Sequence, residues 1–257
     1  MINIKFENTQ VFNFEGALRG MRNPMSSWNK SDSFTARICS DCGGLKEGCG
    51  GCSRTGVEDV RVYIGKNDMK LAQQLIRAGS EHRKFMRQII VSVDITAPLY
   101  WWKEFDTYKV GTVANSTSTM HKLASQPISI DCFEIDDLTS DIRFDGYHDD
   151  CTYSIGETYI PEVISFLESL RKRYLETNDK RYWKELIRWL PESWLQTRTV
   201  TMSYENLLAM CGKGQRRFHK LNEWSGADRP ELVNFISWAR TLPYAQELIF
   251  IDEVDAE

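Results

Sequence analysis

Four cysteines are grouped in one short stretch of this chain. Cys39 and Cys42 form one Cys-x-x-Cys pair, Cys49 and Cys52 form a second, and six residues separate the two pairs. Each pair can present two thiolates to one point, and nearby glycines permit the tight turns that this requires. Because four thiolates around one ion are typical of a closed tetrahedral zinc site, the spacing predicts a zinc knuckle over residues 39–52.

Two disulfides, four unrelated thiols and an iron-sulfur cluster are the alternatives at these positions. An all-cysteine zinc site has no open position for a catalytic water, so we expect the metal to stabilise a loop, with contact to a partner as a further role. Cys132, Cys151 and Cys211 are scattered and are interpreted as small buried hydrophobic residues. His148, Asp149 and Asp150 could bind a metal, but a solvated turn is the favoured interpretation.

Hydroxyl and cationic side chains are concentrated between residues 104 and 122. Such a segment suits an oxyanion, because hydroxyl groups and cations both donate hydrogen bonds to it. His121 and Lys122 close the segment and are candidate phosphate donors, with an exposed surface pair as the alternative. Arg216 and Arg217 lie beside glycines and further lysines, which indicates a second local basic site.

The elements before this segment would hold it in place. Apolar residues alternate from Ile89 to Ile95, which predicts an inner strand over residues 88–96. Pro98 then opens an aromatic helix. Its Trp101 and Trp102 are interpreted as core residues, with stacking on a flat ligand ring as the alternative.

The stretch from Leu75 to Leu123 resembles the flavin-dependent thymidylate synthase family. Members of that family carry a Leu-Ile-Arg-x-Gly helix end, an alternating strand, Ala-Pro, and a loop rich in arginine, histidine and serine. This chain has the helix end at residues 75–79 and the turn at Ala97 and Pro98. In the loop, the positions that correspond to the family's charged signature hold hydroxyls and one cation instead: Thr107, Tyr108, Lys109, Thr112, Thr117 and Thr119.

The resemblance also implies roles for residues outside the loop. Glu104 replaces a glutamine that faces the nucleotide in the family, and Gln88 replaces a histidine that contacts the flavin. Asn206 matches the start of an Asn-Leu helix in the family, and Arg217 falls near a family arginine that contacts the nucleotide phosphate. The implied flavin-binding or nucleotide-binding set, without an assigned catalytic residue, is Gln88, Glu104, Tyr108, Lys109, Thr112, Thr117, Thr119, His121, Asn206 and Arg217.

For the whole chain, the resemblance implies one α+β domain over residues 1–257 that carries the zinc knuckle as an insertion. It implies methylation of a pyrimidine deoxynucleotide, dUMP to dTMP, with reduced FAD and methylenetetrahydrofolate, and with NADPH as a further co-substrate. The protein would mainly position these groups. It also implies a homo-oligomer, a tetramer in the family, with nucleotide sites between subunits.

Two other functions remain open from the sequence. The first is a catalytically inactive nucleotide-binding or regulatory protein that keeps the fold. The second is a zinc-knuckle module that binds protein or nucleic acid through residues near Cys39 and Cys52.

Composition limits the class of protein. The chain has 257 residues, 42% of them hydrophobic, which is enough for a substantial core. Its formal net charge is -4 and its pI is near 5.7, which argues against a protein that binds nucleic acid through a broad positive field. No apolar run approaches the roughly 20 residues that span a bilayer, and the N-terminus has no signal-peptide pattern, so we expect a cytoplasmic protein without a membrane partner.

Periodicity predicts the remaining elements. Asn67 is expected to cap a helix that stops at Gly79, and Arg171 to Arg173 are expected on a solvated face. Residues 127–156 are expected to form an irregular surface excursion with little core. The other predicted elements are one or two short strands in residues 4–14, a helix near residues 16–24, a strand at residues 60–64, and helices at residues 160–176 and 180–189.

Overall fold

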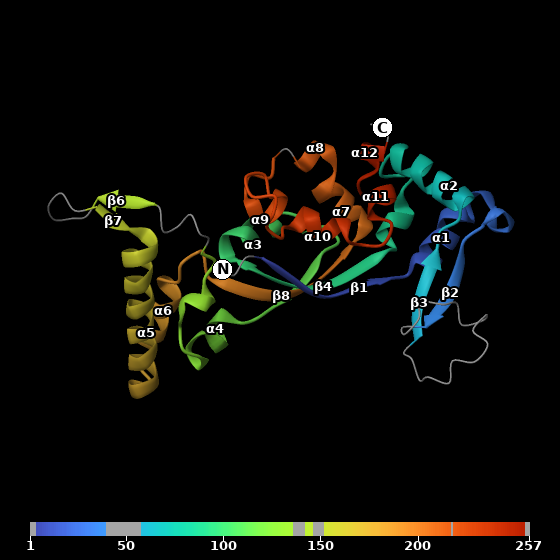
Figure 1. Cartoon of the computed structure of the whole chain (residues 1–257). Coiled ribbons are helices and arrows are strands. Elements are labelled where there is room, and N and C mark those ends of the chain that lie inside the picture. The colour runs from blue at the N-terminus through green and yellow to red at the C-terminus, as the bar shows by residue number, and fades with distance from the viewer. Residues whose placement is uncertain (1–3, 40–57, 136–141, 146–151, 217, 255–257) are drawn as a thin grey trace. The chain divides into compact units, whose positions relative to one another are not determined.

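The computed structural model describes residues 4–39, 58–135, 142–145, 152–216 and 218–254 (Figure 1). The chain forms two compact units. The first unit comprises Met1–Thr9, Ser92–Thr201 and Phe218–Trp238, and the second comprises Gln10–Val91, Met202–Arg217 and Ala239–Glu257. Among the described residues, no helix combines the length and apolar character needed to cross a membrane.

A four-stranded sheet in the order β1-β4-β8-β5 is the largest sheet of the structure. Its strands are β1 (Lys5–Phe12), β4 (Ile90–Pro98), β8 (Leu195–Ser203) and β5 (Val113–Ser116). β5 pairs antiparallel with β8. The sequence predicted only a loop where β5 lies. All four residues of this strand are exposed, so its sequence has no alternation of apolar and polar residues that could identify a strand.

Strand β4 confirms the predicted inner strand, which the structure places at Ile90–Pro98. Val91, Val93 and Ile95 are buried, whereas Ser92 and Asp94 on the opposite face are only half-buried. Since successive side chains of a strand point to opposite faces, this alternation gives the sheet one apolar and one polar face.

Helix α3 (Leu99–Phe105) follows β4 and begins after Pro98. Trp101 and Trp102 are both buried, which confirms the core interpretation. The Trp102 indole donates to the Gln196 carbonyl of β8 at 3.0 Å. Trp101 packs on Trp224 of the short helix α9 (Asn222–Ser225), with ring centroids 4.7 Å apart. Aromatic packing therefore fixes α3 in the first unit.

Helices α5 (Ile160–Thr177) and α6 (Lys180–Arg188) pack side by side in the first unit (Figure 1). Their cluster includes Ile128 and Phe133, so the expectation that residues 127–156 lack a core was wrong for this part. Phe166 of α5 is 47% exposed and does not belong to this cluster.

Arg171 was also expected on a solvated face, and this expectation was wrong. The side chain is buried and donates to both carboxylate oxygens of Glu168 at 2.7 Å. It also donates to the Ala124 carbonyl at 3.2 Å. A run of three charged residues on a helix does not reveal which one faces inward, because residues on a helix rotate by about 100° at each step.

The rest of the first unit consists of short elements. Helix α4 (Thr119–Lys122) follows β5, and β6 (Arg143–Asp145) pairs antiparallel with β7 (Thr152–Ser154). A π-helix, Ile155–Tyr159, leads into α5. The proposed metal-binding turn of His148, Asp149 and Asp150, together with Cys151, lies outside the described residues.

The second unit contains the predicted N-terminal helix as α1 (Phe14–Arg22) and the predicted strand as β3 (Glu58–Tyr63). Its other longer elements are β2 (Phe34–Cys39), α2 (Lys66–Arg77) and α7 (Tyr204–Cys211). Its shorter helices are Asn23–Met25, Trp28–Lys30, Lys84–Arg87, Lys213–Arg216, Ala245–Leu248 and Ile251–Val254, and helix α10 (Phe235–Arg240) bridges the division of the chain at Trp238.

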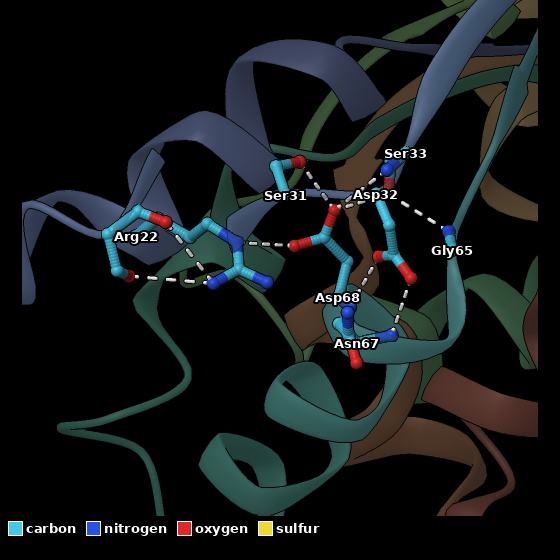
Figure 2. A network of polar contacts seen from close by, with 8 residues as sticks. Arg22, Ser31, Asp32, Ser33, Gly65, Asn67 and Asp68 are labelled. Carbon is cyan, nitrogen blue, oxygen red and sulfur yellow. Dashed lines mark hydrogen bonds and ion pairs between the residues drawn. The ribbon is translucent and has the colours of Figure 1, made fainter. Parts of the chain in front are cut away.

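Asn67 is not the cap of α2. Gly65 occupies the N-cap position, and the carboxylate of Asp32 accepts hydrogen bonds from the backbone N–H groups of Asn67 and Asp68 at 2.9 and 3.1 Å (Figure 2). A carboxylate from a distant segment thus takes the place of a local cap, which sequence reading cannot detect. The helix ends at Arg77, before Gly79 with its φ of 105°.

Strand β2 ends at Cys39, which is paired in register with Glu58, the first residue of β3. Cys42, Cys49 and Cys52 of the predicted zinc knuckle lie outside the described residues, as does the side chain of Cys39. Within the described ranges, no group of three or more His, Cys, Asp or Glu side chains is placed to hold a metal ion. Of the other cysteines, Cys211 is buried, as expected, and Cys132 is half-buried.

Candidate functional site

The structure divides the residues of the predicted site between the two units. Gln88 and Asn206 belong to the second unit, and Arg217 lies outside the described residues. The remaining seven belong to the first unit, and they are Glu104, Tyr108, Lys109, Thr112, Thr117, Thr119 and His121. The first unit therefore carries most of the candidate site.

A cavity of about 280 Å³ lies in the first unit beside α4. Its lining comes from α4, the 3-10 turn that follows it (Leu123–Ser125), α5 and α6, and consists of Met120, His121, Ala124, Tyr174, Lys180 and Trp183. Only His121 of these was a predicted site residue. Lys180 and Trp183 are three residues apart on α6, which places them on one helix face, but their proximity to His121 depends on tertiary packing.

His121 is held in a defined orientation. The Ser118 hydroxyl oxygen accepts the His121 backbone N–H at 3.1 Å and lies 2.8 Å from Nδ1 of its ring. Ser118 is also the N-cap of α4. With Nδ1 engaged by Ser118, Nε2 is the ring nitrogen that can serve a ligand.

Trp183 joins α6 to α4. Its indole Nε1 donates to the Met120 carbonyl at 3.0 Å. This bond fixes an aromatic ring in the cavity wall, while Lys180 adds a positive charge to the same lining. The cavity therefore combines a flat aromatic surface, an oriented imidazole and an ammonium group, which together suit a ring that carries an anionic group.

Glu104 contacts a histidine that the sequence analysis did not select. Oε1 of Glu104 lies 3.0 Å from Nδ1 of His219, whose side chain is fully buried. The imidazole stacks on Trp224 with ring centroids 4.4 Å apart and an interplanar angle of 7°. The Tyr108 ring lies 5.8 Å from Trp224. Two predicted site residues, Glu104 and Tyr108, thus belong to one cluster.

Tyr100 on α3 lies between two carboxylates. Its hydroxyl is within hydrogen-bonding distance of Glu223 and is 3.1 Å from Oε2 of Glu134. Burial, followed by the negative charge of Glu134 and the contact with Glu223, raises the pKa of Tyr100 above its usual range. Tyr100 therefore remains a protonated hydrogen-bond donor at all physiological pH values.

The threonines of the segment differ in their roles. The Thr112 hydroxyl donates to the Tyr108 carbonyl at 2.8 Å, so it stabilises the turn after α3. The Thr117 backbone N–H donates to the Thr197 carbonyl at 2.9 Å, which extends the contact between β5 and β8. Thr119 is the first residue of α4, and Lys109 is exposed. These hydrogen bonds give Thr112 and Thr117 structural roles, in addition to any contact with a ligand.

In the second unit, Gln88 is exposed and lies against α1. A Cβ built at Gly20 would come within 2.7 Å of Oε1 of Gln88, so the glycine provides the space for this amide. Asn206 forms a capping box with Ser203, and its side-chain oxygen accepts the Ser203 backbone N–H at 3.0 Å. Asn206 therefore stabilises the start of α7.

The hydrogen bonds on the polar face of the sheet were also missed from the sequence. Asp94 on β4 accepts the Thr199 hydroxyl at 2.6 Å and the Asn8 amide at 2.8 Å. The Thr199 hydrogen bond, followed by that of Asn8, lowers the pKa of Asp94. Thr96 and Thr197 lie beside this network, with their hydroxyl oxygens 2.7 Å apart. Cross-strand side-chain pairs of this kind require the register of the sheet.

Comparison with solved structures identifies the fold. A flavin-dependent thymidylate synthase (ThyX) from Helicobacter pylori, complexed with FAD and dUMP, matches with a TM-score of 0.56 over 98% of this chain and 99% of its own, at 13% sequence identity. This chain has the ThyX fold. The UMP/dUMP methylase PolB from Streptomyces cacaoi, bound with 5-Br dUMP, matches with a TM-score of 0.58 over 98% of this chain and 96% of its own, at 12% identity.

These matches confirm the fold expected from the residues at 75–123. The sequence itself matches no protein-family model and no curated protein. At 12% to 13% identity, similarity to the ThyX fold does not specify chemistry, because one fold can carry many functions. The assignment of function therefore depends on the side chains of the candidate site.

Proposed function

We propose that this chain is a flavin-dependent enzyme that methylates a pyrimidine nucleotide such as dUMP, with methylenetetrahydrofolate as the carbon donor and NADPH as the reductant. The observation that carries the proposal is the match, over nearly the full length of both chains, to a structure that contains FAD and dUMP and to a UMP/dUMP methylase. The cavity beside His121 supplies the chemistry that a nucleotide needs.

The lining of this cavity fits a nucleotide. Tyr174 and Trp183 provide aromatic rings, and Lys180 and His121 provide donors for an oxyanion. In the proposed role, Lys180 and Nε2 of His121 bind the phosphate, and Ser118 keeps the imidazole in its orientation. These donors compensate for the arginines that the family loop has and this chain lacks.

Reduced flavin, when bound, supplies the hydride that completes the transferred methyl group. The chain's own contribution is to position the nucleotide. No acid or base is assigned among the described side chains. Lys180 fixes one end of the nucleotide by charge, and the Trp183 ring, which its bond to Met120 holds in place, gives the base a surface.

The proposal includes a homo-oligomer. The cavity measures about 280 Å³, whereas sites that enclose a drug-sized ligand typically measure about 300–1,000 Å³. A site for a nucleotide and a flavin together needs more surface than this cavity offers, which favours completion by another subunit. The proposal also includes zinc at Cys39, Cys42, Cys49 and Cys52, because two Cys-x-x-Cys pairs at this spacing suit a closed tetrahedral zinc site. Cys39, which pairs in register with Glu58, is the last described residue before the segment that holds the other three cysteines.

The first experiment is an absorbance spectrum of the purified protein before and after addition of FAD and desalting, because bound oxidised flavin absorbs in the visible range. The second is a dUMP titration of the wild type and of H121A and K180A. Loss of one charge-assisted phosphate contact is expected to weaken dUMP binding about tenfold in each variant. K184A, on the same helix but outside the cavity lining, is the matched control.

Retained flavin and weakened dUMP binding would support the enzyme. A colourless protein that still binds dUMP would indicate the catalytically inactive alternative. Wild-type dUMP affinity in both cavity variants would remove His121 and Lys180 from the phosphate role. Metal analysis of the wild type and C49S tests the zinc separately, since one zinc per chain is expected in the wild type and loss of zinc in C49S.

A further inference from the structure

A second cavity lies in the second unit, and none of the residues assigned to the proposed activity lines it. Its volume is about 180 Å³. It is lined by α1, the segment that follows α1, and the paired strands β2 and β3, through Glu15, Leu18, Arg19, Arg22, Trp28, Ser31, Ser33, Phe34, Thr35 and Val62. Two arginines and two large aromatic residues line this small cavity, and three of these four side chains are exposed.

Arg22 is the exception, since it is buried and its guanidinium is rigidly held (Figure 2). Its Nε donates to Oδ1 of the fully buried Asp68 at 2.5 Å. Asp68 is itself fixed by the hydroxyls of Ser31 and Ser33 at 2.6 and 2.5 Å. Such a network keeps the plane of the guanidinium constant.

Only part of the Arg22 guanidinium is used by this network. Nη1 makes two long contacts to Ser27, at 3.4 Å to the carbonyl and 3.5 Å to the hydroxyl, and Nη2 has no partner among the described residues. Arg19, one turn earlier on α1, has no ion-pair partner within the described part of the chain either. Two arginines that line one cavity therefore have donors available for a planar oxyanion.

The aromatic side chains of the cavity are presented as flat surfaces. Trp28 is 51% exposed although its Nε1 donates to Oδ1 of Asn23 at 2.8 Å, which fixes the indole without covering it. Phe34 is 56% exposed and stacks on Tyr63, its cross-strand partner, with centroids 5.0 Å apart. Exposed aromatic rings that are held in place favour contact with another flat ring.

Charge and size limit the ligand further. Glu15 is the one carboxylate of the lining, and it can accept a hydrogen bond from an N–H group of a heteroaromatic ring. A volume of about 180 Å³ is below that of typical sites for drug-sized molecules, so the enclosed part of the ligand is limited to one heteroaromatic ring system and one acidic group. A dinucleotide would not be enclosed.

We propose that this cavity is a separate binding site for a planar heteroaromatic ring that carries a phosphate or a carboxylate. Arg19 and Arg22 bind the oxyanion, and Trp28 and Phe34 contact the ring. The proposal is independent of the activity proposed above, because none of these residues lines the cavity beside His121.

The test is isothermal titration calorimetry on the full chain with AMP, adenosine, nicotinate and inorganic phosphate as probes. AMP and nicotinate combine ring and anion in the phosphate and carboxylate forms, and the comparison between them identifies the source of the oxyanion. R19A and W28A are the variants, since both side chains are exposed and their loss should leave the fold intact. Each variant is expected to weaken binding of the preferred probe about tenfold.

Matched controls are available in the same chain. K30A removes an exposed cation close to Trp28 but outside the cavity lining, and W189A removes an exposed indole with a similar bond to a side chain, that to Glu185 at 3.0 Å. Both should bind the probe as the wild type does. H121A should also bind it normally, which separates this site from the cavity on α4.

Three results would overturn the proposal. The first is that neither AMP nor nicotinate gives a heat of binding. The second is that AMP and adenosine bind with equal affinity while nicotinate does not bind. The third is that R19A and W28A both bind the probe with wild-type affinity. Binding that is lost in H121A but kept in R19A would likewise assign the probe to the other cavity.

Discussion

The imidazole of His219 is fully buried, and its Nδ1 lies 3.0 Å from Oε1 of Glu104. Glu104 comes from α3, and His219 follows the basic segment after α7, so 115 residues separate the partners. Loss of a hydrogen bond to a buried ring nitrogen is costly, because water does not replace it. Glu104 therefore anchors the segment around His219 whatever its contact with a ligand.

Glu104→Gln and Glu104→Ala separate the hydrogen bond from the charge. The amide oxygen of glutamine can still accept from Nδ1–H, so E104Q should lose less than about 1 kcal/mol of unfolding free energy. E104A should lose about 1–3 kcal/mol, because the buried imidazole then loses its hydrogen bond to the carboxylate. Urea unfolding measures both values. Equal losses in the two variants would show that the charge, and not the hydrogen bond, stabilises this pair.

Asp68→Asn should be among the most destabilising single changes in the second unit. It leaves the guanidinium of the buried Arg22 without its carboxylate, and breaking a buried ion pair from one side costs about 3–5 kcal/mol. Chemical unfolding of D68N measures this loss. D228N is the matched control, because Asp228 is exposed, and it should stay within about 0.5 kcal/mol of the wild type.

The same carboxylate gives an expected pH dependence. Burial alone would raise the pKa of Asp68, but hydrogen bonds from Ser31, Ser33 and Arg22 outweigh burial and hold the pKa below the ordinary value of 3.8. Since the folded pKa is lowered, Asp68 stabilises the protein fully above pH 3.8 and loses this contribution as the pH falls through the folded pKa.

The difference in unfolding free energy between wild type and D68N should therefore be constant at neutral pH and shrink below about pH 4. Unfolding curves of both proteins at pH 7, 5, 4 and 3 measure it. Comparison with D68N removes the contributions of Asp94, Glu168 and Asp179, whose pKa values are lowered as well. A difference that grew on acidification would contradict the assigned direction of the Asp68 pKa.

Local patterns predicted the elements with regular burial. Strand β4 could be identified because Val91, Val93 and Ile95 alternate with polar residues, and α3 because Pro98 opens an aromatic run. Strand β5 could not, because all four of its residues are exposed. Its position depends on pairing with β8, whose paired residues lie 82 to 88 positions later in the sequence, from Ser116↔Arg198 to Val113↔Thr201.

The site was harder to predict than the fold, because its residues are also brought together by contacts between distant parts of the sequence. His121 was selected from its hydroxyl-rich neighbourhood, but its cavity partners Lys180 and Trp183 lie on α6 and looked like ordinary helix residues. The capping of α2 by Asp32 and the pairing of Glu104 with His219 are likewise long-range contacts. Sequence patterns report local periodicity, whereas these contacts exist only after packing.

Ser118→Ala tests how His121 is positioned. The change removes the N-cap of α4 and the hydroxyl beside Nδ1, so the imidazole gains freedom that dUMP binding must then restrict. A lost hydrogen bond of about 0.5–1.5 kcal/mol corresponds to dUMP binding weakened about twofold to twelvefold.

S125A is the matched control, since the Ser125 hydroxyl donates to the Lys122 carbonyl at 2.6 Å and does not touch His121. Equilibrium dialysis with dUMP on S118A, S125A and the double variant S118A/H121A measures the effect, and in H121A the Ser118 change should have no further consequence. If S118A weakened binding equally with and without His121, Ser118 would act through the start of α4 and not through the imidazole.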